Sequence, residues 1–189
     1  MTSAKKTPIT FLLHEWRRGE QSAFHQLTPL VYNELHRVAA AYMRRERPDH
    51  TFSPTALVSE AFVRLSEGEP SEATDRNQFF ALAAHHMRSI LVDHARRRLA
   101  GKRGGKNRPI TFDESLAPHE RPEEIVVLDE ALEALAKFDE RKARIVELHY
   151  FGGMGYNDIA TTLSLSETTV GREVRTAQAW LHRHITSPG

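Results

Sequence analysis

Histidines are the residues of this sequence that could most readily bind a metal ion, because the chain has 11 of them and no cysteine. The lack of cysteine excludes a disulfide framework, a cysteine-ligated zinc site and a thiol nucleophile. His85 and His86 are adjacent and point to different faces of a helix, and His182 and His184 are split in the same way. The sequence has no His-x-x-x-His pair with a nearby acid, which a zinc peptidase helix would need. We therefore expect ordinary surface or half-buried histidines.

Other catalytic patterns are also missing from the sequence. The segment 101–105 contains glycine and lysine but lacks the spacing of a phosphate-binding P-loop, and no Gly-x-Ser-x-Gly nucleophile elbow occurs. Glu123 and Glu124 are adjacent in polar sequence, where solvated charge is the simpler interpretation. We predict that the protein is not an enzyme and holds no metal or cofactor.

The net charge of +1 conceals a strong local asymmetry. From residue 88 to residue 108 the sequence is basic, and Asp93 is its one acid. From residue 113 to residue 133 it is acidic, and Arg121 is its one base. A basic block beside an acidic block indicates a local phosphate-binding surface, with a solvated helix end as the alternative.

Two short helices joined by a tight turn are predicted near the C-terminus, over residues 156–163 and from 167 to about 184. Ser166 is a good cap for the second helix, and Glu167 suits its positive end. Residues at helical spacing would pack the two helices together: Ile159, Ala160, Val170 and Val174. This spacing is typical of a helix-turn-helix, whose second helix enters the major groove of DNA. A helical hairpin with a purely structural role is the alternative.

The second helix of this motif carries the residues expected to contact DNA. Arginine can bond guanine through two hydrogen bonds, glutamate can accept from cytosine, and hydroxyl groups can reach phosphates or base edges. The turn has Ser164 where glycine is usual, and serine enters the left-handed backbone region only at a cost. The predicted DNA-contacting residues are Ser166, Thr168, Thr169, Arg172, Glu173 and Arg175.

Helical periodicity also dominates the rest of the chain, and strand patterns are absent, so the predicted fold class is all-α. Ser53 and Pro54 form a helix start signal, because serine can cap and proline suits the first helical position. The polar stretch from Ser66 to Asn77 is expected to be a loop. Apolar residues recur at helical spacing over residues 24–42, 57–65, 80–94, 126–135 and 145–149.

Residues 102–122 are rich in glycine, proline and charge without a period, which predicts a flexible linker. This linker separates two small helical domains, at residues 8–101 and 123–186. Near the N-terminus, Phe11, Leu12 and Leu13 are followed at once by polar residues, so no signal peptide or membrane span is expected. The expected location is the cytoplasm, with no membrane partner.

The two halves together resemble the extracytoplasmic-function (ECF) branch of the bacterial sigma-70 family, from about Trp16 to Ile185. Residues 56–65, Ala-Leu-Val-Ser-Glu-Ala-Phe-Val-Arg-Leu, look like the family's region 2.2 helix, which grips the β′ clamp helices of RNA polymerase. Residues 79–98 look like regions 2.3 and 2.4, which melt and read the −10 promoter element. The second half looks like region 4, which docks on the β flap and reads the −35 element.

This resemblance implies a factor that binds core RNA polymerase and promoter DNA, and an anti-sigma factor is a further candidate partner. Opening a promoter needs cations for phosphates and side chains that hold unpaired bases, but no chemical step. The predicted −10 residues are Arg76, Asn77 and Gln78 in a loop, and Arg88, Arg96, Arg97 and Arg98 on a basic helix. The predicted core-polymerase contacts are Thr55, Leu57, Ser59, Glu60 and Arg64.

The sequence departs from the family pattern in three places. Many members have aspartate at Ala56 and glutamine at Ser59, so the polymerase contact would rest more on Glu60, Arg64 and apolar packing. Gly171 stands where a basic residue is common, which would remove one phosphate contact.

A stand-alone helix-turn-helix regulator is the alternative function. Such a protein would not require the basic helix over residues 88–98 or the polar-faced helix over residues 55–64, whereas a sigma factor requires both.

Overall fold

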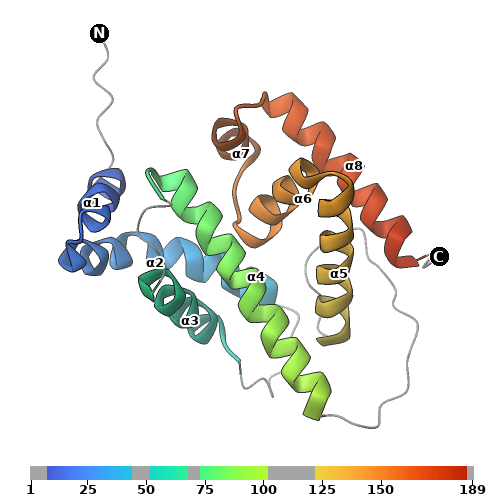
Figure 1. The fold of residues 1–189 in the computed structure, drawn as a ribbon, viewed down its shortest axis with the longest axis horizontal. Coiled ribbons are helices and arrows are strands. Elements are labelled where there is room, and N and C mark those ends of the chain that lie inside the picture. The colour runs from blue at the N-terminus through green and yellow to red at the C-terminus, as the bar shows by residue number, and fades with distance from the viewer. Residues whose placement is uncertain (1–7, 44–51, 68–72, 102–121, 187–189) are drawn as a thin grey trace.

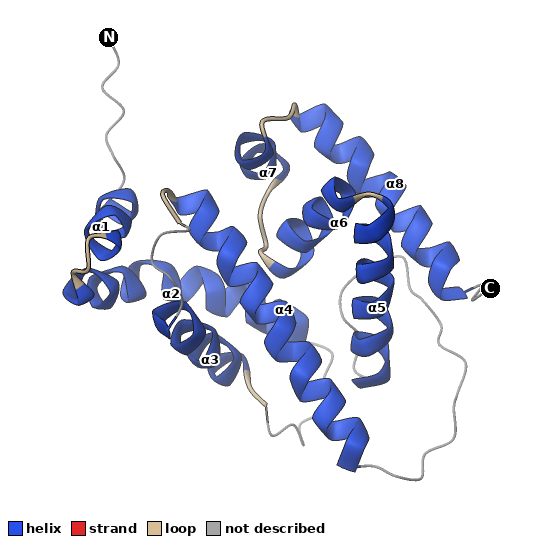
Figure 2. Cartoon of the chain, viewed as in Figure 1, coloured by secondary structure: helices blue, strands red, loops and turns tan. Residues whose placement is uncertain are grey.

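The computed structural model describes residues 8–43, 52–67, 73–101 and 122–186 (Figure 1). Within these ranges the chain is helical and contains no strand, as Figure 2 shows, which confirms the predicted all-α class. Most of the predicted linker, residues 102–121, lies outside the described residues. The predicted helix end at residues 44–48 lies outside them too.

Helices α1 (Pro8–Arg17) and α2 (Gln21–Met43) form the first pair. The chain reverses between them at Gly19, whose φ of 95° lies in the left-handed region that glycine enters without penalty. Trp16 is 1% exposed and lies against Phe24, with the ring centroids 4.7 Å apart. Aromatic burial of this kind anchors α1 on α2.

Helix α3 (Pro54–Glu67) begins where the sequence predicted. The Ser53 hydroxyl accepts from the Ala56 backbone N–H at 3.1 Å, so the predicted cap is confirmed. Four apolar residues bury its inner face against α2 and α4: Leu57, Val58, Ala61 and Leu65.

Helix α4 (Arg76–Gly101) starts earlier than expected. Asp75 caps it by accepting from the Gln78 N–H at 2.9 Å, and the Gln78 side chain accepts from the Thr74 N–H at 2.8 Å. This reciprocal pair satisfies backbone groups that a helix start leaves open. The prediction of a loop through Asn77 was therefore wrong, because the signal for the helix start lies in Thr74 and Asp75.

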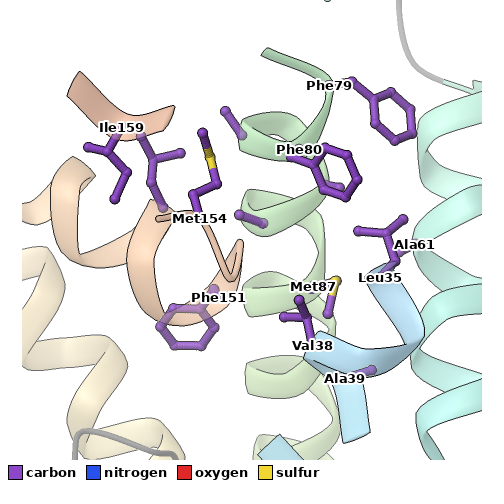
Figure 3. Close-up of a cluster of buried hydrophobic side chains, with 14 of the residues drawn as sticks. Leu35, Val38, Ala39, Ala61, Phe79, Phe80, Met87, Phe151, Met154 and Ile159 are labelled. Atoms are coloured by element: carbon purple, nitrogen blue, oxygen red, sulfur yellow. The ribbon is translucent and has the colours of Figure 1, made fainter. Parts of the chain in front are cut away.

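Helix α4 is apolar around much of its circumference, which is typical of a helix packed on more than one side. Phe79 and Phe80 are both at most 2% exposed, and so are Ala83, Ala84 and Met87. Figure 3 shows side chains of α2 and α3 on one side of α4, and Phe151, Met154 and Ile159 on the other. Helix α4 therefore lies between α2 and α3 on one side and the second half of the chain on the other.

The second half contains helices α5 (Pro122–Phe138), α6 (Glu140–Val146), α7 (Tyr156–Leu163) and α8 (Glu167–Thr186). A π-helical turn, η1 (Glu147–Phe151), follows α6 directly. The Asp139 carboxylate caps α6 by accepting from the Lys142 N–H at 3.0 Å. The buried residues of both halves form one continuous hydrophobic core.

Candidate nucleic-acid interfaces

Helices α7 and α8 and the turn between them form a helix-turn-helix with the predicted boundaries. Ile159 and Val170 are fully buried, Ala160 is 6% exposed and Val174 is 1% exposed, so these side chains pack the motif internally. The Ser166 hydroxyl accepts from the Thr169 N–H at 3.1 Å, which confirms the predicted cap of α8. In Figure 1 the α7–α8 corner lies at the edge of the molecule, away from α2 and α3.

Ser164 ends α7 in the left-handed conformation, with φ 55° and ψ 45°. This confirms the expectation that the turn uses a position where glycine is usual. The backbone N–H of Leu165 donates to the Ala160 carbonyl at 2.9 Å, which closes the helix end.

Replacing Ser164 with glycine should raise the free energy of unfolding by about 0.5–1 kcal/mol, because glycine adopts this conformation without a Cβ penalty. Urea unfolding followed by circular dichroism would measure the change. Ser164→Ala is the matched comparison and should not be stabilising, because alanine retains the Cβ. A glycine variant less stable than the wild type would contradict this account of the turn.

Of the predicted DNA-contacting residues, Thr168, Arg172 and Arg175 are exposed on α8, and Ser166 is exposed immediately before its first residue. Thr169 is half-buried, and its hydroxyl lies 2.8 Å from that of Ser166, so its first role is in the cap. Two guanidinium groups and two hydroxyl groups, exposed on α8 and at its start, are suited to contact bases and phosphates.

Glu173 does not belong to this face, so the prediction that it points outward was wrong. Its side chain is 8% exposed and lies 2.9 Å from the ammonium group of Lys142 on α6. Arg141 approaches the same carboxylate at 3.4 Å. Because a buried carboxylate needs opposite charge close by, Glu173 acts as an ionic link between α6 and α8.

The Lys142 ammonium group also bonds Asp139, the cap of α6. The Asp139 and Glu173 hydrogen bonds raise the pKa of Lys142, and the Lys142 hydrogen bond lowers the pKa of Asp139. Sequence spacing could not reveal the link to Glu173, because Lys142 comes from another helix.

Gly171 also faces inward. A Cβ at this position would lie 3.3 Å from the Tyr156 ring, so the glycine allows α7 and α8 to approach closely. Gly171 is a buried packing position, and the expected loss of one phosphate contact here stays a prediction.

The three predicted −10 residues at the start of α4 are all engaged within the chain. The Arg76 guanidinium pairs with Glu34 on α2 and lies 4.7 Å from the Phe80 ring centroid. The Asn77 amide donates to the Asp158 carbonyl on α7 at 3.4 Å, and Gln78 bonds Thr74 as described above. They lie in the first turn of a helix and not in a loop.

Two of the predicted −10 arginines on α4 converge on one carboxylate of α5. The Arg88 Nη2 lies 2.7 Å from Asp129 Oδ1, and the Arg96 Nη2 lies 3.1 Å from Asp129 Oδ2. Arg88 is only 17% exposed, and Asp129 is 9% exposed. Further along α4, Arg97 is exposed and donates to the Asp93 carbonyl at 3.2 Å, and Arg98 is half-buried.

A second carboxylate, Glu147 of η1, faces the same part of α4. Its Oε1 lies 3.4 Å from Arg88 Nη1 and 3.3 Å from His85 Nδ1, and its other oxygen pairs with Arg144. Burial by itself would raise the pKa of Glu147, but the His85 hydrogen bond and the Arg144 charge outweigh it and hold the pKa at about 2.

The predicted core-polymerase contacts divide into surface and interior positions. Thr55 and Ser59 are exposed on α3, and Glu60 is half-buried. Leu57 is completely buried in the α2–α3–α4 core, so the prediction that it contacts a partner was wrong. The apolar period of α3 already placed it on the inner face.

Arg64 connects α3 to α4. Its guanidinium donates to the Ser89 hydroxyl and to the Asp93 carboxylate, both at 3.0 Å. Val63 is 52% exposed, four residues after Ser59, so it extends the outer face of α3. The sequence signal for Val63 is an apolar residue on an otherwise polar helix face.

Within the described residues, no group of three or more histidine or acidic side chains could hold a metal ion. Among the same residues, no helix combines the length and apolarity that crossing a membrane requires.

Comparison with known proteins assigns the chain to a family. A search of curated proteins gave no match. Among solved structures, the chain is similar to CnrH in complex with the cytosolic domain of CnrY, at 19% sequence identity and a TM-score of 0.41. That alignment covers 97% of this chain and 100% of CnrH. The ECF sigma factor family matches residues 6–187, nearly the full length. The chain therefore belongs to the ECF sigma factor family, a group of non-enzymatic transcription initiation factors.

Proposed function

We propose that this chain binds core RNA polymerase and directs it to specific promoters, with α8 reading the −35 element and α4 engaging the −10 element. The observation that carries the proposal is the exposed row of Thr168, Arg172 and Arg175 on the second helix of a helix-turn-helix, with Ser166 exposed just before it. Such a row can enter a major groove and contact base edges and phosphates. The same proposal assigns residues 8–101 and 123–186 to separate functional domains and places the protein in the cytoplasm.

The first half of the chain supplies the other two proposed binding surfaces, one for the −10 element and one for core polymerase. Arg88, Arg96, Arg97 and Arg98 give the later turns of α4 four cations for the −10 region and its displaced strand. The outer face of α3, with Thr55, Ser59, Glu60 and Val63, is proposed to contact the β′ clamp helices. The involvement of the β flap and of an anti-sigma factor stays a prediction from the family resemblance.

The proposal is tested by binding to purified bacterial core RNA polymerase, followed by run-off transcription from a library of promoter fragments. Core binding with selective initiation is the expected result, and the selected fragments would reveal the −35 and −10 sequences together. A protein that ignores core polymerase and binds duplex DNA alone as a dimer would instead be a stand-alone regulator.

Arg172→Ala should weaken holoenzyme binding to a selected promoter by about 10- to 100-fold, since one two-bond arginine–guanine contact contributes about 1–3 kcal/mol of discrimination. The loss should be largest for promoters with the preferred −35 sequence. Fluorescence anisotropy with labelled promoter DNA would measure it. Arg183→Ala removes an equal charge from an exposed site about three turns further along α8 and should have a smaller effect. Equal losses for both variants would indicate a purely electrostatic contribution.

A further inference from the structure

We propose that Arg141 of α6 is a further DNA contact of this chain, which binds a phosphate of the −35 element on the opposite side of α8 from α7. The inference rests on the proposed function, because it concerns the same helix-turn-helix in the same major groove. The contact lies outside the recognition helix and carries no sequence information. Phosphate contacts of this kind fix the register and orientation of a recognition helix on the duplex.

Arg172 projects between the two helices that flank α8. Consecutive helical residues are about 100° apart, so Gly171, Arg172 and Glu173 point in three successive directions around α8. A Cβ on Gly171 would lie 3.3 Å from the Tyr156 ring of α7. The Glu173 carboxylate lies 3.4 Å from the Arg141 guanidinium of α6. Helix α7 therefore borders the exposed face of α8 on one side, and the start of α6 borders it on the other.

This arrangement brings the two flanking helices next to different DNA backbones. The major groove is about 12 Å wide, and a helix with its side chains is about 10–12 Å in diameter, so a recognition helix fills the groove between two rows of phosphates. The first helix of a helix-turn-helix crosses one of these backbones, and in this chain that helix is α7. The other row of phosphates then faces the start of α6, where the Arg141 side chain is 54% exposed.

Arg141 and Arg172 lie side by side against one carboxylate oxygen. Arg141 Nη2 is 3.4 Å and Arg172 Nη2 is 3.8 Å from Glu173 Oε1. Both distances are longer than a strong charge-assisted hydrogen bond, which is about 2.7–2.9 Å. The Arg172 side chain is 69% exposed, so both guanidinium groups are accessible to an anion.

The buried Glu173 carboxylate has a closer partner than either arginine. The Lys142 ammonium group lies 2.9 Å from Glu173 Oε2 and is only 18% exposed, so Lys142 is the structural link between α6 and α8. Arg141 can therefore turn towards a phosphate without leaving Glu173 unpaired. Lys142 also bonds Asp139, and with both arginines this cluster has three cations against two carboxylates. The remaining positive charge favours an anionic ligand.

The salt dependence of promoter binding by the holoenzyme tests this inference. Losing one phosphate contact should lower the slope of log K against log salt by about 0.9, because fewer counterions are released. We expect this smaller slope for Arg141→Ala, which gives about an eightfold weaker affinity at about 0.1 M salt if the curves meet near 1 M. The loss should be the same for every −35 sequence, whereas that of Arg172→Ala should depend on the sequence.

Two control variants accompany Arg141→Ala. Arg183→Ala removes the same group from an exposed site further along α8 and should leave the slope unchanged. Arg141→Lys keeps the charge and should retain the wild-type slope. Circular dichroism verifies that each variant keeps its helices.

A matched change in the DNA identifies the phosphate that Arg141 binds. Single phosphates of the −35 element are replaced by neutral methylphosphonates, and the wild type should lose affinity at positions on both backbones that border the groove. At one position across the groove from α7, Arg141→Ala should remove that loss, because the contact is already broken. The scan of the wild type needs no variant, so it remains decisive if Arg141→Ala does not fold.

A wild-type slope for folded Arg141→Ala, a loss that changes with the −35 sequence, or methylphosphonate effects confined to the backbone near α7 would overturn the Arg141 contact. Each of these results would leave the proposed function intact. A wild-type chain that forms no promoter-binding holoenzyme would instead overturn the proposed function, before any variant is compared.

Discussion

Replacing Glu173 by alanine should lower the free energy of unfolding by about 1–3 kcal/mol, the usual cost of removing one partner of a buried polar pair, because Lys142 keeps its bond to Asp139. The physical reason is that the Lys142 ammonium group, 18% exposed, loses the carboxylate 2.9 Å away. The contact between α6 and α8 then loses its ionic link. Urea unfolding followed by circular dichroism would measure the loss.

Glu167→Ala is the control for this prediction, because it removes an exposed acid from the first turn of the same helix. Its cost should stay near 0.3–1 kcal/mol, as expected for a charge that interacts with the helix dipole at the surface. Equal costs for the two variants would mean that Glu173 is not a structural link. If Glu173→Ala lost promoter affinity at unchanged stability, Glu173 would instead be a DNA contact.

Acidification should destabilise the chain through Glu147. Its pKa is lowered from the ordinary value of 4.5 to about 2 in the folded state. A depressed pKa adds stability that is complete above pH 4.5 and is lost as the pH falls towards 2. At about 1.4 kcal/mol for each unit of pKa, this one carboxylate contributes on the order of 3 kcal/mol at neutral pH.

Glu147→Gln should therefore reduce stability strongly at pH 7, and the difference from the wild type should shrink as the pH approaches 2. Urea unfolding at a series of pH values would trace the difference. Glu133→Gln, at an exposed position on α5, provides the control. A difference between Glu147→Gln and wild type that is the same at every pH would show that ionisation of Glu147 does not stabilise the fold.

Local signals in the sequence were sufficient for much of the helix-turn-helix. The boundaries of α7 and the start of α8 agree with prediction, because a capping serine and a left-handed turn residue act over a few residues. The same holds for Ser53 and Pro54 at the start of α3. The start of α4 was missed because its reciprocal cap, formed by Thr74, Asp75 and Gln78, lay in a stretch interpreted by its polarity alone.

Leu57 and Glu173 show two different reasons why a site residue assigned from the sequence can be wrong. Leu57 could have been excluded from the surface by its helical period, so this error was avoidable. Glu173 lies next to the buried stripe of α8. A carboxylate can be buried there only because an opposite charge from another helix offsets the loss of hydration. That partner, Lys142, is 31 positions earlier in the chain, and no local rule connects the two.

By itself, the sequence determined the helical class, the caps, the helix-turn-helix and the family resemblance, because each depends on residue type and short-range spacing. Only the tertiary structure decided that α4 is covered on both sides and that Asp129 and Glu147 meet its arginines. Basic and acidic blocks were visible in the sequence, but their pairing depends on how α5 and η1 pack against α4. Long-range charge pairing is set by that packing, because the strength of an ion pair depends on distance and burial.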